Sequence, residues 1–122
     1  MDTGQIEIRP AKLEDAPDIS SLSEQLGYQS SGAEVTQRLE NIIKSNGHCV
    51  LVACQIDGKI SGWIHVFSTL RVESDSFCEI GGLVVDEVFR NQGIGAKLVY
   101  AAQEWTTQKG LRILILRQYL DF

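Results

Sequence analysis

The chain has 122 residues, with 16 acidic and 11 basic side chains, so its net charge is −5. This length suits one small domain, and 43% apolar with 22% charged residues is typical of a folded protein rather than a disordered one. The acidic balance disfavours a nucleic-acid or acidic-membrane partner, because both require a basic surface. No basic-then-apolar leader and no apolar run of membrane-spanning length occurs, so we expect a cytoplasmic protein whose residues 1–122 form a single domain.

Hydrophobic periodicity predicts the elements of the first half of the chain. Apolar residues at helical spacing indicate helices, and short alternating or apolar runs indicate strands. The predicted elements are a strand at 5–9, a helix over Lys12–Leu26, a helix around Val35–Ile43, and strands over His48–Gln55 and Ile60–Phe67. The Asp57-Gly58 pair predicts a hairpin turn between the last two, which are therefore antiparallel.

The second half predicts a strand, a long helix and a final strand. The strand covers Phe77–Val85, and its apolar or small run from Ile80 onward is typical of a strand covered on both faces. A helix over Ala96–Lys109 follows, and Leu111–Leu116 reads as the last strand. A helical crossover joins these two strands, so they must be parallel. The fold class is therefore α/β with a mixed sheet.

The turn between the Phe77–Val85 strand and the long helix has the features of an anion-binding site. Gly93 and Gly95 open the helix, where unpaired N–H groups and the positive end of the helix dipole favour a phosphate. Arg90 adds a cation beside them. A dinucleotide fingerprint is excluded because Leu98 occupies the third glycine position, and the lysine of a P-loop is missing.

Arg90-Asn91-Gln92-Gly93-Ile94-Gly95 matches the pattern [Arg/Gln]-x-x-Gly-x-[Gly/Ala] and resembles the GCN5-related N-acetyltransferase (GNAT) family. Ile6–Ala11 and Gly58–Ile64 extend the resemblance, which covers residues 6–116. It implies a GNAT-like acyl-CoA N-acyltransferase fold and acetyl-CoA as co-substrate. It also implies an amine of a small molecule or peptide as acceptor, attacking the thioester directly.

The same resemblance implies the residues that hold the donor. The two parallel strands splay apart in the family, and the pantetheine arm enters the gap beside backbone groups of the first strand. The pyrophosphate lies on the amides that open the helix. The implied donor-binding residues are Leu83, Val84, Val85, Arg90, Asn91, Gln92, Gly93, Ile94, Gly95 and Ala96.

Two residues are candidates for the catalytic base. Glu79 lies among apolar neighbours in the Phe77–Val85 strand, and such surroundings would raise its pKa toward neutrality. The alternative is an exposed carboxylate at a strand end. His65 is the second candidate, because the ordinary pKa of histidine suits a base, and the alternative is a hydrogen-bonded core or groove residue. We expect no metal site, since the three cysteines lack the spacing of metal ligands.

The chain departs from the family pattern after the last predicted strand. The family continues with a further helix and a strand pair, and that helix carries a tyrosine that protonates the leaving thiolate. Tyr119 lies too close to the strand to match that tyrosine. An exposed apolar edge strand is a liability, so we expect either a homodimer that covers it or impaired catalysis. The alternative function is a non-catalytic acyl-CoA-binding module.

Overall fold

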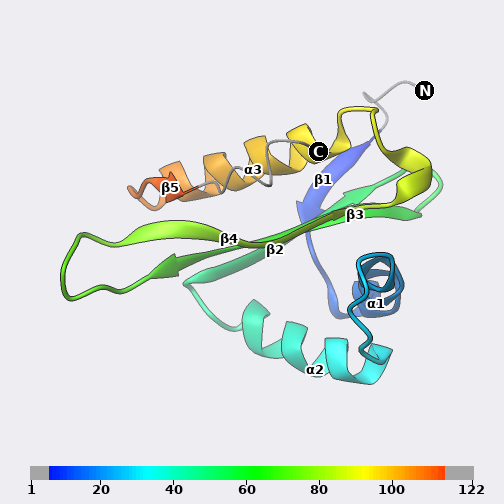
Figure 1. The fold of residues 1–122 in the computed structure, drawn as a ribbon, viewed down its shortest axis with the longest axis horizontal. Coiled ribbons are helices and arrows are strands. Elements are labelled where there is room, and N and C mark those ends of the chain that lie inside the picture. The colour runs from blue at the N-terminus through cyan, green and yellow to red at the C-terminus, as the bar shows by residue number, and fades with distance from the viewer. Residues whose placement is uncertain (1–5, 115–122) are drawn as a thin grey trace.

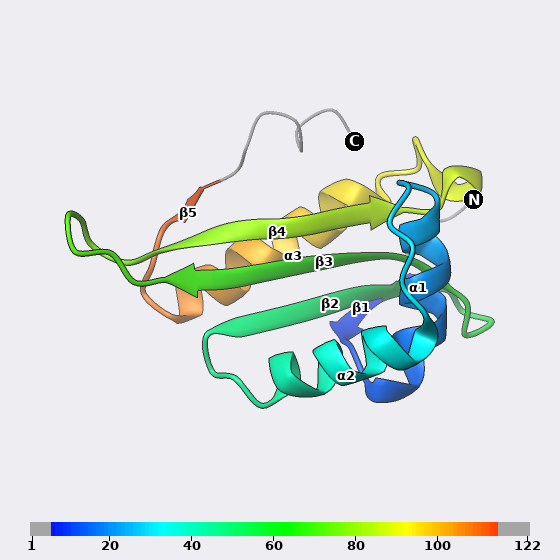
Figure 2. The same ribbon diagram turned by 60° about the horizontal axis from the view of Figure 1, so that its bottom comes forward.

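The computed structural model describes residues 6–114. They form a five-stranded sheet in the order β1-β2-β3-β4-β5, seen nearly face-on in Figure 2. The strands are β1 (Glu7–Pro10), β2 (His48–Cys54), β3 (Ile60–Thr69), β4 (Phe77–Val85) and β5 (Ile113–Leu114). The first four pair antiparallel with their neighbours, and β5 is parallel to β4. The predicted mixed α/β class is confirmed.

The helices cover both faces of this sheet (Figure 1). Helix α3 (Ile94–Gln108) packs on one face, against a core that includes Ile64, Val66 and Leu98. Helices α1 (Ala16–Glu24) and α2 (Gly32–Ile43) cover part of the other face around Val52 and Leu22. Two short 3-10 helices, η2 (Leu13–Asp15) and η3 (Glu87–Phe89), precede α1 and α3.

The single helix predicted over Lys12–Leu26 is wrong in its first turn. Residues Leu13–Asp15 form η2 instead, because the buried Asp15 carboxylate accepts the Lys12 N–H at 2.8 Å and two bonds from Arg9 at 2.8 and 3.0 Å. Burial alone would raise the pKa of Asp15, but these hydrogen bonds outweigh it and hold the pKa below its usual value. These hydrogen bonds fix the angle at which the chain leaves β1 and enters α1.

Local capping chemistry also sets the starts of the two longer helices. Helix α2 starts at Gly32, where Ser31 and Glu34 form a capping box with bonds of 3.1 and 2.8 Å. Helix α3 starts at Ile94, before the predicted Ala96, because Gly93 takes the left-handed conformation (φ 82°) as its N-cap.

Strand β4 changes its facing in the middle because it contains a β-bulge. His65 pairs with Gly82 and Val66 with Ile80, so Gly81 has no partner on β3. Cys78 and Ile80 therefore face α3, and after the bulge Leu83 faces it too. The expectation of a strand covered on both faces is wrong here, because Gly81 is exposed on the side opposite α3.

Strand β5 meets β4 only at Cys78 and Glu79 within the described residues. The predicted last strand, Leu111–Leu116, begins only at Ile113 and is described up to Leu114. Tyr119 lies outside the described residues. Over residues 6–114, no helix combines the length and the apolar character needed to cross a bilayer.

Candidate active site

The turn that enters α3 presents backbone N–H groups that no side chain of residues 6–114 caps. Gly93 makes no side-chain capping bond, and its carbonyl starts the helix by accepting the Lys97 N–H at 3.1 Å. Asn91 also has a positive φ of 66°, so the loop turns twice through left-handed geometry. The Arg90 Nε donates to the Val85 carbonyl at 3.2 Å, which holds its guanidinium beside the turn. Such a turn is suited to an anion.

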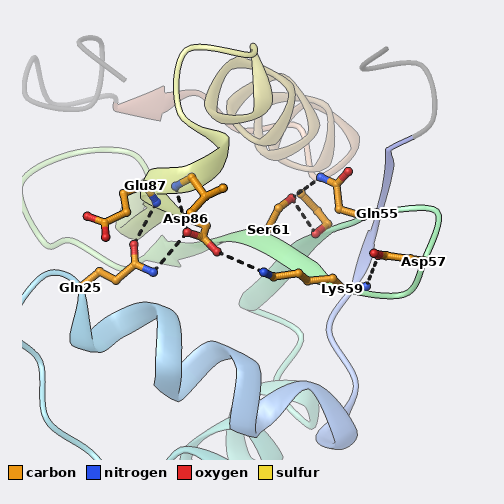
Figure 3. Close-up of polar contacts among 9 residues, drawn as sticks. Gln25, Gln55, Asp57, Lys59, Ser61, Asp86 and Glu87 are labelled. Atoms are coloured by element: carbon orange, nitrogen blue, oxygen red, sulfur yellow. Dashed lines mark hydrogen bonds and ion pairs between the residues drawn. The ribbon is translucent and has the colours of Figure 1, made fainter. Parts of the chain in front are cut away.

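The start of this loop is fastened to α1, as Figure 3 shows. The buried Asp86 carboxylate accepts the Val88 N–H at 3.1 Å and the Gln25 Nε2 at 3.3 Å. Gln25 in turn accepts the Glu87 N–H at 3.0 Å, and the Lys59 Nζ lies 4.0 Å from Asp86. We call Gln25, Asp86 and Glu87 the α1 latch. Sequence reasoning missed Gln25, because its partner lies more than 60 residues away.

The free edge of β4 presents backbone groups in alternation. The backbone N–H of Asp86 donates to the Ser61 carbonyl at 2.8 Å, so Ser61 and Asp86 form a hydrogen-bonded pair. In an antiparallel ladder these pairs alternate, which makes Trp63 and Val84 the next such pair. The N–H and C=O groups of Leu83 and Val85 therefore point away from β3, toward an edge where the described residues place no strand.

This alternation corrects one expectation. Val84 directs its backbone groups to β3 and has none for a pantetheine arm. Leu83 turns both of its groups outward, and Val85 turns its N–H outward while its carbonyl accepts from the Arg90 Nε. Val84 instead lines a cleft of about 430 Å³ on the α1 side of the sheet. The residues that line this cleft are Ser23, Leu26, Tyr28, Ser30, Val35, Arg38, Trp63, Gly81, Gly82, Leu83 and Val84. The outward edge of β4 and this cleft meet at Leu83.

Glu79 does not have the apolar enclosure expected from the sequence. Its side chain is 32% exposed, and its Oε1 lies 3.3 Å from the Arg71 Nη2. Its position at the β5-paired end of β4, two residues before Gly81, puts it on the same face as the cleft. Glu79 is therefore a charged group close to the cleft but not among its lining residues.

His65 lies in a stack of rings next to the bulge. Its Nε2 is 2.9 Å from the His48 Nδ1, and its ring centroid is 5.4 Å from that of Phe67. Burial, with a smaller effect of His48, lowers the pKa of His65 to about 4. The expectation that its ordinary pKa suits a base is wrong, because a group with so low a pKa is a weak base at neutral pH.

The rings of Trp63, His65 and Phe67 form an aromatic wall beside β4. Two glycines of β4 allow this wall to lie flat on the strand. A Cβ at Gly82 would lie 2.8 Å from the Trp63 indole, and one at Gly81 would lie 2.9 Å from the Phe67 ring. Trp63, His65 and Phe67 share one face of β3. The Trp63 indole N–H is buried with no acceptor among the described residues.

Metal chemistry has no visible ligand set in this region. Over residues 6–114, no group of three or more His, Cys, Asp or Glu side chains lies close enough to hold an ion.

The uncapped helix start, the free β4 edge and the adjoining cleft together form one candidate site. A family model described as "Acetyltransferase (GNAT) family" matches residues 14–120. The chain therefore belongs to the GNAT family of acetyltransferases.

Individual relatives agree with this assignment. An uncharacterized N-acetyltransferase of Chlorobaculum tepidum is 32% identical over 105 residues, and the match covers 85% of this chain and 62% of that protein. Glucosamine-6-phosphate N-acetyltransferase from Arabidopsis thaliana has a TM-score of 0.81 at 23% identity, covering 91% of this chain and 81% of that one. The aminoglycoside N-acetyltransferase AAC(6')-Iy, solved with a CoA bisubstrate analog, has a TM-score of 0.76 at 22% identity, covering 91% and 78%.

Proposed function

We propose that this protein is an acetyl-CoA-dependent N-acetyltransferase that transfers the acetyl group directly to an amine of a small molecule or peptide. The proposal depends on two features that occur together: the uncapped amides at the start of α3 and the outward backbone groups of Leu83 and Val85. A diphosphate and an extended amide-bearing arm match these two features in order along the chain.

The donor site follows from that match. The N–H groups from Asn91 to Ala96 hold the pyrophosphate, and Arg90 adds a positive charge. Leu83 and Val85 pair with the pantetheine arm as a neighbouring strand would. The outward N–H of Leu83, at the border of the cleft, polarises the thioester carbonyl. The complex of AAC(6')-Iy with a CoA bisubstrate analog supports the choice of donor.

Glu79 is the residue we propose as base. It is a carboxylate on the cleft face, roughly 7 Å along the strand from Gly81, so a bridging water would reach the amine. His65 is neutral at physiological pH and keeps the aromatic wall in place without accepting the proton.

Titration calorimetry with acetyl-CoA, followed by a thiol-release assay over a panel of amines, tests the function. We expect binding and amine-dependent thiol release. Glu79→Gln should lower kcat roughly 100-fold and leave acetyl-CoA binding intact. Glu73→Gln is the matched control, because Glu73 also lies near Arg71, at 3.6 Å, but is exposed on the β3–β4 hairpin. Equal losses in both variants would contradict the base assignment.

The same assay separates the alternative. Tight binding of acetyl-CoA without thiol release, for every amine, would make the chain a non-catalytic acyl-CoA-binding module. Tighter binding of ATP than of CoA would overturn the donor assignment itself.

A further inference from the structure

The cleft beside β4 has one formally charged residue among the described residues that line it. This residue is Arg38 of α2, and the strand segment Gly81–Val84 lines the same cleft. Three carboxylates lie around it without lining it. Glu34 lies one helical turn earlier on α2 and 3.8 Å from Arg38, Glu24 lines a separate hollow that shares Ser30, and Glu79 lies on the same face of the sheet. The one formal charge among the described lining residues is therefore positive, although the chain as a whole carries a charge of −5.

The Arg38 guanidinium keeps donors available for a ligand. Its Nη1 donates to the Ser30 Oγ at 2.8 Å, which orients the group toward the α1–α2 loop. Its Nη2 is 3.8 Å from Glu34 Oε2, which is too long for a hydrogen bond. Glu34 is meanwhile held by the Ser31 N–H at 2.8 Å. A planar guanidinium with free N–H groups suits bidentate recognition of a carboxylate or phosphate.

The remaining cleft wall is mostly apolar. Leu26, Val35 and the Trp63 indole line it together with Val84. Tyr28 is 67% exposed at the same cleft and brings a phenol ring to it. A ligand that fills this space would place an apolar body against these side chains and an anionic group at Arg38.

We infer that the acceptor is an amine that also carries an anionic group on a largely apolar body, and that Arg38 binds this group. This inference rests on the proposed function and names the substrate class of the same site. A polycationic acceptor would meet a guanidinium with no carboxylate among the described lining residues, so the cleft disfavours it. Arg38 thus determines which acceptor binds. The edge of β4 holds and polarises the thioester.

Matched acceptor pairs test this. The pairs are leucine and leucinamide, 6-aminohexanoate and its amide, and O-phosphoethanolamine and ethanolamine, which separate carboxylate from phosphate and short from long spacers. Each is assayed with the native protein and with Arg38→Gln. For each acceptor, the kcat/KM of the native protein is divided by the kcat/KM of Arg38→Gln. This ratio does not depend on the intrinsic reactivity of the amine. Lys44→Gln at the end of α2 is the control, since Lys44 is also exposed and ion-paired at i,i+4 but does not line the cleft.

For at least one pair, Arg38→Gln should lower kcat/KM for the anionic member roughly tenfold, through a higher KM. Its kcat/KM for the neutral member should not change. Lys44→Gln should have the native kcat/KM for both members. The 62% exposure of the Arg38 side chain keeps the expected effect at this lower end. Rising salt should shrink the native preference, and Arg38→Lys should retain part of it.

A second readout needs no turnover. Titration calorimetry of the same pairs into the CoA-saturated protein should show the anionic preference and its loss in Arg38→Gln. Transfer to amines with equal efficiency for charged and neutral members would overturn the inference and leave the transferase function standing. Absence of acetyl-CoA binding would instead overturn the proposed function.

Discussion

At the scale of single residues, the two glycines of the β4 bulge decide the shape of the site. They let Trp63, His65 and Phe67 lie directly on the strand, because each lacks the Cβ that would collide with a ring. The two adjacent glycines, Gly81 and Gly82, are visible in the sequence. The aromatic contacts that make glycine necessary come from β3 and could be seen only in the folded sheet.

Gly82→Ala should lower the free energy of unfolding by about 1–3 kcal/mol, because the new Cβ would lie 2.8 Å from the Trp63 ring. Displacing the indole should also alter the cleft and raise KM for the acceptor. Gly32→Ala is the control, since Gly32 begins α2 with open space around it. Urea unfolding measures both. If Gly82→Ala is as stable as the control, the proposed steric role is wrong.

His65 makes stability depend on pH. Its folded pKa of about 4 is lower than the ordinary value of 6.5, so its stabilisation is complete above the unfolded pKa. It should be lost as pH falls from about 6.5 toward 4, because protons then bind preferentially to the unfolded chain. We expect a loss of about 1–2 kcal/mol after allowing for the partial exposure of the ring.

Urea unfolding of the native protein and of His65→Gln across this pH range measures the effect. The variant should show a flatter profile, while the losses caused by carboxylates such as Asp15 remain in both proteins. Parallel profiles would show that His65 does not titrate as proposed.

At the scale of elements, the α1 latch connects a helix that borders the cleft with the loop proposed to hold the donor. Gln25 follows the last residue of α1, and its amide bonds both Asp86 and Glu87. The strand, loop and long helix at this place were predictable from the sequence, because periodicity and glycine placement are local signals. The latch was not, since it depends on how two distant segments pack.

Gln25→Ala should weaken acetyl-CoA binding about 3- to 10-fold, because the start of the loop proposed to hold the pyrophosphate loses two hydrogen bonds. Titration calorimetry gives the dissociation constant. Gln108→Ala, at the exposed far end of α3, is the control and should bind normally. An unchanged affinity in Gln25→Ala would show that the latch does not support the loop.

At the scale of the whole molecule, a small chain with helices on both faces of its sheet should gain stability from the proposed ligand. Saturation at 100 times the dissociation constant adds about 2.7 kcal/mol to the folded state. For a domain of this size we expect acetyl-CoA to raise Tm by roughly 10 °C. Thermal melts with acetyl-CoA and with ATP at the same concentration measure this. An equal shift with ATP would contradict the assignment of the donor.

The expected homodimer concerns the strand that follows α3, of which the residues beyond Leu114 lie outside the described part of the chain. Light scattering of the protein with and without acetyl-CoA tests it directly. A monomer in both states would remove the dimer from the proposal.

The alternating backbone of β4 has a consequence for solvent exchange. If a metabolite completes the ladder at this edge, the amide hydrogens of Leu83 and Val85 should exchange quickly in the free protein and slowly once acetyl-CoA is present. That of Val84, already bonded within the protein, should hardly change. Proton NMR would then detect acetyl-CoA on this edge as slowed amide exchange at every second residue of the strand.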